Sequence, residues 1–317
     1  MLGKTANGIF WMFRSLERSE NVARMLEAGF RIALTRSISA NEEWESILWA
    51  SGNHDAFTAE HDGFATADVI DFMLRDRENP SSVISIVEQA RTNARLVRTA
   101  LTREVWESTN DTWLNLRQTL AEPVTERRLP AVLDEIRSQS RQVRGALHGT
   151  MLRNDIYSFA RLGTFIERAD NTARMLDVKY YTLLPSVAAV GTEVDNVQWE
   201  MLLRSLSALT SYRWLHGNEV SAGSIADFLM LDRRMPRSLA FCYGTIVENL
   251  TALSEAYALR MPCHTVAEAT WRMLSSTSID AIFAEGLHEF TEQFIQRNAG
   301  LANQIETDFR FHPDPAP

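Results

Sequence analysis

Apolar residues recur at three- and four-residue spacing along almost the whole of the 317-residue chain. The alternation of apolar and polar residues that is typical of β-strands is nearly absent, and long tracts contain neither glycine nor proline. A spacing of three and four residues places apolar side chains along one face of an α-helix. The pattern therefore predicts an all-α protein, a helical bundle of about 10–12 helices.

Two of the predicted helices are long, and the first carries a polar stripe. They cover residues 5–37 and 152–183. At 100° of rotation per residue, Glu17, Asn21 and Arg24 fall on one face of the first helix. The residues on the opposite face are apolar: Leu16, Ala23, Leu26 and Phe30.

The other predicted helices are shorter, and capping residues, proline or glycine mark their ends. Asn41 is expected to cap the second helix, and Asp71 to take part in a capping box. Pro80 is favoured at a first helical position, where its missing N–H needs no partner. A loop is expected at 51–64 and a connection at 185–193. The helices cover residues 41–49, 68–76, 80–103, 106–120, 125–147, 237–260, 266–275 and 279–309.

One ten-residue stretch occurs twice in the chain, 150 residues apart. Residues 17–26 read ERSENVARML and residues 167–176 read ERADNTARML, with seven of the ten positions identical. A second pair of similar segments follows in the same order, DVIDFMLRDRENPSS at 68–82 and SIADFLMLDRRMPRS at 224–238. Segments that recur in one order are the signature of an internal repeat.

A third landmark, a Trp-Glu dipeptide, lies between these segments in both copies. It is Trp44-Glu45 in the first and Trp199-Glu200 in the second. The order of the three landmarks indicates an internal duplication, with a first half at 1–148 and a second half at 149–317. We expect the halves to pack together as one compact domain about a pseudo-twofold axis.

The polar stripe has an ordinary explanation and a more specific one. Glu20 and Arg24, like Asp170 and Arg174, are acid–base pairs four residues apart, which stabilise an exposed helix by a few tenths of a kcal/mol. Such pairs do not explain why a glutamate and an asparagine also recur, as Glu17 with Asn21 and as Glu167 with Asn171. These residues favour a buried polar cluster with satisfied hydrogen bonds. The cluster is either structural or a ligand site.

The second pair of segments places an arginine at a break between helices. Arg77 and Arg233 are these residues, and most loop arginines are simply solvated. The alternative is a clamp for an anion, because guanidinium matches the geometry of carboxylate and phosphate. Asp71 and Asp227 in the same segments are expected to be capping residues.

Charge and composition narrow the classes of function. The net charge is −9, and an acidic surface disfavours sequence-independent binding of nucleic acid. The two cysteines, Cys242 and Cys263, have no metal-binding or redox spacing. The amino-terminal residues resemble no signal peptide, and no apolar run is long enough to span a membrane. We expect a cytoplasmic protein with no membrane or nucleic-acid partner.

No motif for a cofactor or a metal is present. Glycine-rich phosphate loops and nucleophile elbows are absent from the sequence. Glu285 and His288 have the Glu-x-x-His spacing of di-iron bundles, but those bundles need two such pairs and two further glutamates. We therefore expect neither a metal nor a cofactor, although a carboxylate-bridged metal enzyme is a third, weaker reading.

The chain resembles the bacterial alpha-E family, a helical domain of unknown function. The resemblance is carried by MLGKTANGIFWMFRSLERSENVARML, DFMLRDRENPSSV and REVWESTNDTW, and it covers essentially the whole chain. It places the family's first motif at Glu17, Arg18, Asn21 and Arg24, and the second at Asp76, Arg77 and Pro80. Genes of this family commonly neighbour a circularly permuted ATP-grasp ligase, often with a transglutaminase-like protein. The resemblance thus implies a role in ATP-dependent formation of amide or peptide bonds.

Two hypotheses follow. In the first, the chain is a component of an amidoligase system and binds an amino-acid- or peptide-like ligand between its repeat helices. Glu17 and Glu167 would hold or deprotonate an amine, and Arg24 and Arg174 would fix a carboxylate. In the second, the chain is a non-catalytic scaffold that docks and positions the ligase. A basic stripe would then be the docking surface, formed by Arg91, Arg95 and Arg98.

Overall fold

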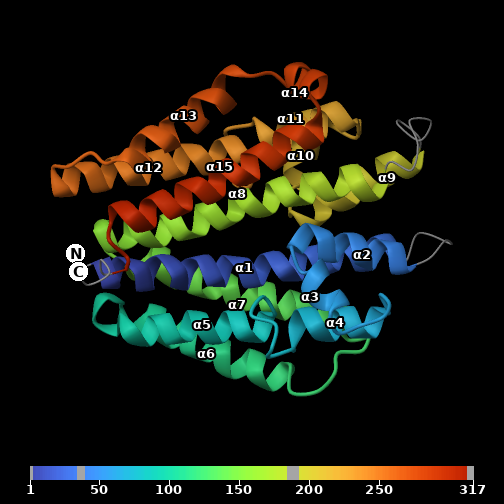
Figure 1. The fold of residues 1–317 in the computed structure, drawn as a ribbon, viewed down its shortest axis with the longest axis horizontal. Helices are drawn as coiled ribbons and strands as arrows, with labels where there is room; N and C mark the ends of the chain where they lie inside the picture. Colours follow the sequence, from blue (N-terminus) through green and yellow to red (C-terminus); the bar gives the residue numbers. More distant parts are fainter. Residues whose placement is uncertain (1–2, 34–39, 184–192, 313–317) are drawn as a thin grey trace.

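A computed structural model describes residues 3–33, 40–183 and 193–312 of the chain (Figure 1). Every regular element in these ranges is helical, which confirms the predicted all-α class. Fifteen α-helices are present in them, more than the 10–12 predicted. The predicted loop at 51–64 contains a short helix, the predicted helix at 279–309 is broken in two, and three further helices lie between residues 193 and 230. The bounds of the fifteen are α1 Gly3–Ala33, α2 Ala40–Ser51, α3 His54–Thr58, α4 Thr66–Leu74, α5 Val83–Leu96, α6 Arg103–Thr119, α7 Leu129–Thr150, α8 Asp155–Leu183, α9 Glu193–Ser205, α10 Leu209–His216, α11 Ala222–Met230, α12 Leu239–Tyr257, α13 Pro262–Ser276, α14 Ile279–Glu285 and α15 Leu287–Asp308.

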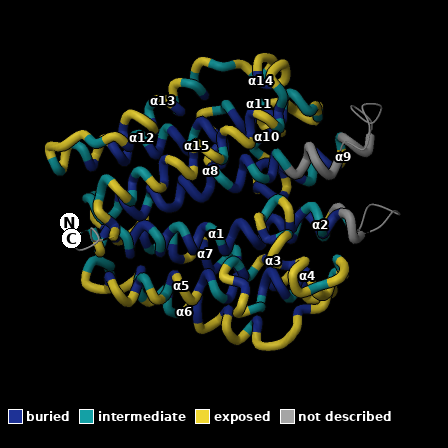
Figure 2. The backbone as a smooth tube through the Cα atoms, viewed as in Figure 1, coloured by how far each residue is buried: buried dark blue, intermediate teal, exposed yellow. Residues whose placement is uncertain are grey.

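The two long helices, α1 and α8, lie side by side in the middle of the molecule and run in the same direction (Figure 1). Helices α5 and α7 pack on α1, whereas α12 and α15 pack on α8. Both long helices are buried along most of their length (Figure 2). Other helices cover most of their side chains, so most polar residues of the repeated stretch lie in the interior and not on a solvated face.

Gly163 lets α8 approach α1 closely. A Cβ atom on Gly163 would lie 2.2 Å from the carbonyl oxygen of Phe10 and 3.1 Å from the backbone nitrogen of Arg14. Both contacts are shorter than van der Waals separation, so only a residue without a side chain fits. The close approach brings Glu17 on α1 within reach of the side chains that follow Gly163 on α8.

Serine, and not proline, caps the helices that follow the second shared segment. The Oγ of Ser82 accepts from the backbone N–H of Ser85, and the Oγ of Ser238 accepts from that of Phe241. Pro80 therefore lies in the turn before α5, and the prediction that it begins the helix is wrong. A serine side chain can satisfy a free N–H of the first turn, which a proline ring cannot.

Other predicted helix ends also need correction. Asp71 does not cap α4, because its carboxylate pairs with Arg75 one turn later. Asp227 lies inside α11, which Ser221 caps. Asn41 lies inside α2, which begins one residue earlier. The connection predicted after Pro185 lies outside the described residues except for its last residue, where α9 begins.

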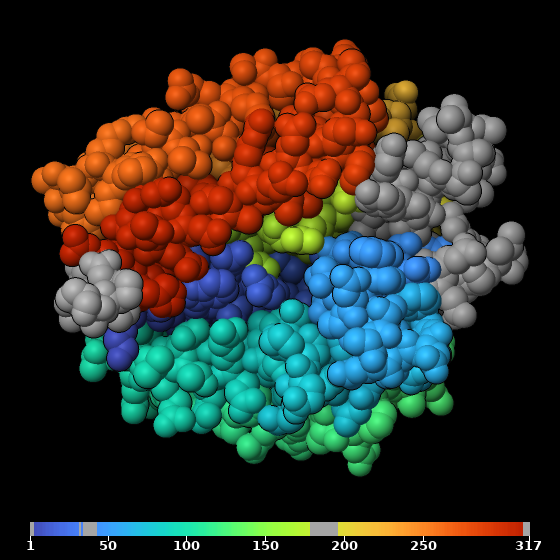
Figure 3. All heavy atoms as spheres, viewed as in Figure 1, coloured from blue at the N-terminus to red at the C-terminus, as the bar shows by residue number. Residues whose placement is uncertain are grey.

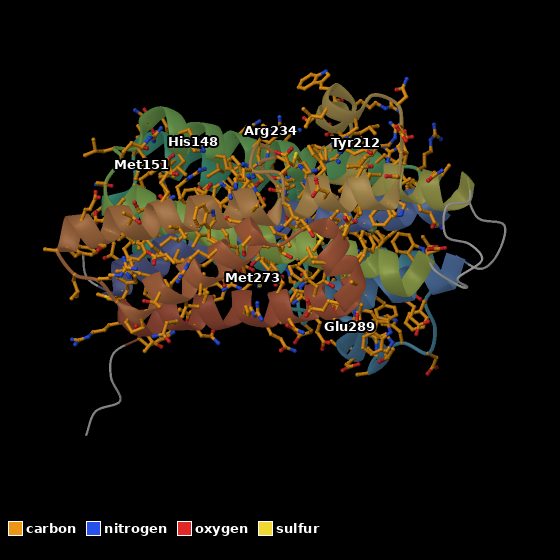
Figure 4. The ribbon with its side chains drawn as sticks, turned by 90° about the horizontal axis from the view of Figure 1, so that it is seen from above. His148, Met151, Tyr212, Arg234, Met273 and Glu289 are labelled. Carbon is orange, nitrogen blue, oxygen red and sulfur yellow. The ribbon has the colours of Figure 1, made fainter. Side chains whose placement is uncertain are left out.

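The last long helix is broken into α14 and α15 at Gly286. This residue has a φ of +113°, which an L-residue with a side chain rarely adopts. At the other end of the molecule, α7 is followed by a short turn to α8. Figure 4 shows His148, in the last turn of α7, near Met151, which follows that helix. The Nδ1 of His148 lies 2.9 Å from the hydroxyl of Tyr157.

Candidate functional site

The Glu-Arg dipeptides of the two copies pair with each other across the α1–α8 interface. Glu17 accepts two hydrogen bonds from Arg168, from Nε at 2.8 Å and Nη2 at 3.0 Å. Glu167 accepts two from Arg18, from Nε at 2.6 Å and Nη2 at 2.9 Å. Two-point pairs of this kind are among the strongest side-chain hydrogen bonds and are highly directional. The exchange between Glu17–Arg168 and Glu167–Arg18 is hereafter called the cross-pair.

The carboxylates of α1 are enclosed by arginines. Glu17 also receives Nη1 of Arg144 from α7 at 3.0 Å, and Nη1 of Arg237 lies 3.2 Å from its Oε1. Arg237 donates through Nη2 to Glu20 at 2.8 Å. Glu20 is fully buried and is also bonded by Arg24 and Arg144. We call the group the closed cluster; its members are Glu17, Glu20, Arg24, Arg144, Arg168 and Arg237.

Ionisation in the closed cluster is controlled by these arginines. Burial by itself would raise the pKa of Glu17, but Arg168, Arg144 and Arg237 outweigh it and lower that pKa to about 2. The pKa of Glu20 is lowered well below its usual value by Arg237, Arg144 and Arg24 against the same effect of burial. Burial lowers the pKa of Arg237 to about 9. Both carboxylates are thus ionised at neutral pH, and a carboxylate with so low a pKa is a weak base.

The carboxylates of α8 have fewer partners. Besides Arg18, Glu167 receives Nε of Arg14 at 2.9 Å. Asp170, the counterpart of Glu20, accepts from Arg174 Nε at 2.7 Å and has no other hydrogen bond to a described residue. Burial raises the pKa of Asp170, although Arg174 opposes it, whereas Arg18 and Arg14 outweigh burial and lower the pKa of Glu167 to about 2. These residues, Glu167, Asp170, Arg14, Arg18 and Arg174, form the open cluster.

A cavity of about 270 Å³ lies beside the open cluster. Its walls come from α1, α8, the turn after α2 and the turn before α5. In the space-filling view, a hollow lies between the segments around α2 and α15, with α1 and α8 visible at its floor (Figure 3). The lining residues are Arg18, Asn21, Val22, Met25, Ser51, Gly52, Asn53, Ser81, Glu167, Asp170, Asn171 and Arg174.

Two asparagines that line this cavity hold polar atoms without a protein partner. Asn171 is 2% exposed, and neither its Oδ1 nor its Nδ2 is bonded within the described residues. Asn21 is 3% exposed; its Nδ2 donates to the carbonyl oxygen of Glu167 at 3.2 Å, but its Oδ1 has no partner there. An unsatisfied buried polar group costs about 1–3 kcal/mol. A polar ligand in the cavity would relieve that cost.

A second and larger cavity, of about 660 Å³, adjoins the first and shares Arg174 with it. It lies between α2, α8 and α15. Glu45, Asp177 and Glu292 contribute carboxylates to its wall, and Trp49 contributes an aromatic face. The Nδ1 of His288, also on the wall, lies 2.6 Å from Oδ1 of Asp177. The two cavities together offer room for a ligand larger than a single charged group.

The predicted site residues separate into three groups. Glu167, Asn21, Asn171 and Arg174 line the smaller cavity, whereas Glu17 belongs to the closed cluster. Arg24 is also enclosed there and donates to the carbonyl oxygen of Ser205 at 2.6 Å.

The two loop arginines do not reach either cavity. Arg77 is exposed and pairs with Glu88 at 3.3 Å. The guanidinium carbon of Arg233 lies 5.3 Å from the ring centre of Trp271. The structure therefore does not bring the two residues proposed as anion clamps to the polar cluster.

Sequence reasoning gave no contact or role to the arginines that complete the clusters. Arg18 was named only as a residue of the family's first motif, yet it and Arg168 could have been assigned to the clusters, because each follows the repeated glutamate directly. Arg14, Arg144 and Arg237 had no such signal, since the matching positions of the other copy hold other residue types. Among the described residues, no group of three or more histidine, cysteine and acidic side chains is placed to hold a metal ion.

Residues 1–309 match the model of the Alpha-E family, described as a predicted alpha-helical domain with a conserved ER motif. The Glu-Arg dipeptides that form the cross-pair correspond in type to that motif. No curated protein and no solved structure matches the sequence. In the part of the chain that the structure describes, no helix combines the length and the apolarity required to cross a membrane.

Proposed function

The chain belongs to the Alpha-E family, and from that premise we propose that it is the ligand-binding component of an ATP-grasp-linked amidoligase system. The ligand is a small amino-acid- or peptide-like molecule that carries the acceptor amine. The single observation that supports this proposal is the cavity beside the open cluster, with buried asparagine atoms that lack protein partners. The cavity lies between α1 and α8, where the two copies of the repeated stretch meet.

The proposed roles follow from the contacts of each residue. Glu167 and Asp170 hold the amine, and Asn21 and Asn171 accept or donate the remaining hydrogen bonds. Arg174, which lines both cavities, is placed to bind a carboxylate of the same ligand. Because the pKa of Glu167 is about 2, we assign it the holding of an amine and not its deprotonation. Glu17 and Arg24 support the site from the closed cluster.

In the proposed reaction, the partner does the activation chemistry. A circularly permuted ATP-grasp ligase would transfer the γ-phosphoryl group of ATP to a carboxylate and form an acyl phosphate. The ligand's ammonium group would first lose a proton to solvent. The neutral amine would then attack the acyl carbon, form the amide bond as phosphate leaves, and give up its second proton to solvent. The partner and the reaction follow from the family resemblance, and the cavity supports only the binding of the ligand.

The second candidate is a non-catalytic scaffold that positions the ligase. It is favoured by the closed cluster, where four arginines satisfy two carboxylates without any ligand. In this reading the polar residues of the closed cluster lock the two long helices together.

The docking surface proposed for such a scaffold is the basic stripe. Two of its members make contacts within the chain: Arg91 donates to Asn110 at 2.9 Å, and Arg98 lies over Trp106.

An amide-forming assay with a circularly permuted ATP-grasp ligase as the partner separates the two candidates. Asn171→Leu fills polar space in the cavity with an apolar side chain and should abolish product formation while the ligase still co-purifies. Asn249→Leu, at a buried position of α12 that lines neither cavity, is the matched control and should retain activity. Full activity of Asn171→Leu would refute a ligand site and favour the scaffold.

A further inference from the structure

We propose that the cavity beside the open cluster binds a guanidinium or ammonium group of its ligand in the place that Arg237 fills beside the closed cluster. The Arg237 guanidinium would thus occupy at the closed cluster the position that the ligand's cationic group takes at the open cluster. The inference rests on the proposed function for the use of the ligand, but the nature of the bound group is argued from the two clusters alone.

The first step concerns the turns before α5 and α12. The sequence reads Pro80-Ser81-Ser82 in one and Pro236-Arg237-Ser238 in the other. Ser82 and Ser238 both cap their helices, so Ser81 and Arg237 have the same relation to the helix that follows. The Arg237 side chain extends into the closed cluster, while Ser81 lines the cavity. A short side chain therefore replaces a long cationic one at the open cluster.

The second step concerns the arginine supplied by the packing helices. Ser140 of α7 donates to the carbonyl oxygen of Leu16, and Asn298 of α15 donates to that of Ile166, at the matching position of α8. Four residues after each of these lie Arg144 and Ala302. Arg144 bonds both carboxylates of the closed cluster, whereas Ala302 is a buried alanine. The open cluster lacks this arginine as well, and Arg14 replaces it in part.

The third step is a comparison of charges. The closed cluster holds two carboxylates and four guanidinium groups, and the open cluster holds two carboxylates and three. One ligand cation would raise the number of cationic groups at the open cluster to that of the closed cluster. The pKa of Asp170 is raised by burial, whereas that of Glu20 is held well below its usual value, as expected if Asp170 lacks one cationic neighbour.

The acceptors face the cavity in a suitable arrangement. Oε1 of Glu17 receives both Arg168 and Arg237, but Oε1 of Glu167 receives Arg18 alone among the described residues. The partnerless Oδ1 atoms of Asn21 and Asn171 add two further acceptors. Acceptor-rich walls fit a group that only donates, such as guanidinium or ammonium. The rest of the ligand would extend past Arg174 to the larger, carboxylate-lined cavity.

The test uses the full chain and isothermal titration at neutral pH and constant ionic strength. The probes are agmatine, L-arginine and putrescine, with acetate and phosphate as anionic probes. We expect the cationic probes to bind the natural chain, and Ser81→Arg to weaken them at least about tenfold because its own guanidinium fills the cavity. Ser276→Arg, at an exposed residue of α13 that lines neither cavity, adds the same charge elsewhere; it is the matched control and should bind as the natural chain does.

A second variant keeps the test valid if Ser81→Arg fails to fold, which circular dichroism would reveal. Asp170→Asn removes the carboxylate but keeps the shape, and it should also weaken the cationic probes at least about tenfold. Binding of acetate or phosphate in place of the cations, or unchanged binding to both variants, would overturn the inference. If the natural chain binds the cations and the variants do not, but the natural chain gives no amide product in the ligase assay, the inference stands and the proposed function is refuted.

Discussion

Glu17 and Glu167 hold corresponding positions in the repeated stretch, yet their surroundings differ. Glu17 is bonded by arginines from α7, α8 and the turn before α12. Glu167 is bonded by two arginines of α1, and the side chain of one of them, Arg18, is 34% exposed. A buried charge without its partner is far more costly than a half-exposed one. The same substitution should therefore have unequal effects at the two residues.

Glu17→Gln leaves Arg168 without its carboxylate partner in the interior, and it leaves Arg144 and Arg237 with Glu20 alone. We expect it to lower the free energy of unfolding by about 3–5 kcal/mol, the range for breaking a buried pair. Glu167→Gln should lower it by less, because Arg18 can reach solvent. Urea unfolding of the two variants measures the difference, and equal losses would contradict the distinction between a closed and an open cluster.

The two glutamates also predict how stability depends on pH. Their pKa falls from 4.5 to about 2 on folding, so the folded state favours the ionised form. Each therefore contributes stability that is present above about pH 4.5 and is lost as the pH falls toward 2, on the order of 3 kcal/mol per residue. Asp170, whose pKa is raised, acts in the opposite sense.

Urea unfolding between pH 7 and pH 3 should therefore show a steep loss of stability below about pH 4.5. Glu17→Gln should flatten this dependence, since one of the contributing carboxylates is then absent. The free energy of unfolding should begin to fall near the pKa of glutamate in the unfolded chain. A fall centred near pH 6.5 would instead assign the dependence to histidine.

At the scale of the element, α1 and α8 are the two helices that periodicity predicted best. Their long tracts without glycine or proline, and the polar stripe of Glu17 and Asn21, were readable from local sequence. Helix starts at the second shared segment were not, because the cap depends on which side chain reaches a free N–H, and Ser82 does so where Pro80 was expected. The approach of the two long helices depends on Gly163, whose role is visible only when Phe10 lies beside it.

Gly163→Ala tests whether this close approach holds the cross-pair together. An added methyl group would overlap the carbonyl oxygen of Phe10, so α8 must move away from α1. We expect a loss of about 1–3 kcal/mol, typical of overpacking. Gly145→Ala in α7 is the control, because nothing lies within 4 Å of its Cβ position, and it should be neutral or stabilising by up to about 1 kcal/mol. Thermal and urea unfolding compare the stabilities of the two variants. If Gly163→Ala were as stable as the natural chain, the close approach at Gly163 would not be needed to hold the cross-pair together.

At the scale of the whole molecule, the helices of the predicted first half, α1–α7, lie on one side, and α8–α15 lie on the other (Figure 1). The segments of the clusters come from both sides, so local patterns could not predict the site in full. Arg237 contacts Glu20, which is 217 residues away in the sequence, and no spacing in the sequence predicts that contact. The repeat indicated Glu17, Asn21 and their counterparts in α8. It could not indicate Arg144 and Arg237, because the matching positions of the other half hold other residue types.

The two halves, residues 1–148 and 149–317, are predicted to depend on each other for folding. Separation would expose the apolar faces of α1 and α8 and leave both members of the cross-pair without partners. We expect each fragment alone to lack cooperative thermal unfolding, and an equimolar mixture to regain helical circular dichroism. A fragment that unfolds cooperatively by itself would show that the half is an independent domain.

The cross-pair also limits how α1 and α8 can move against each other. Glu17 reaches one residue forward along α8 to Arg168, while Arg18 reaches one residue back to Glu167. A slide of one helix along the other would lengthen one pair and compress the opposite one, whichever direction it took. Sliding is thereby resisted in both directions. Any coupling between an occupied cavity and the far side of the molecule should therefore not travel as a shift of one half along the other.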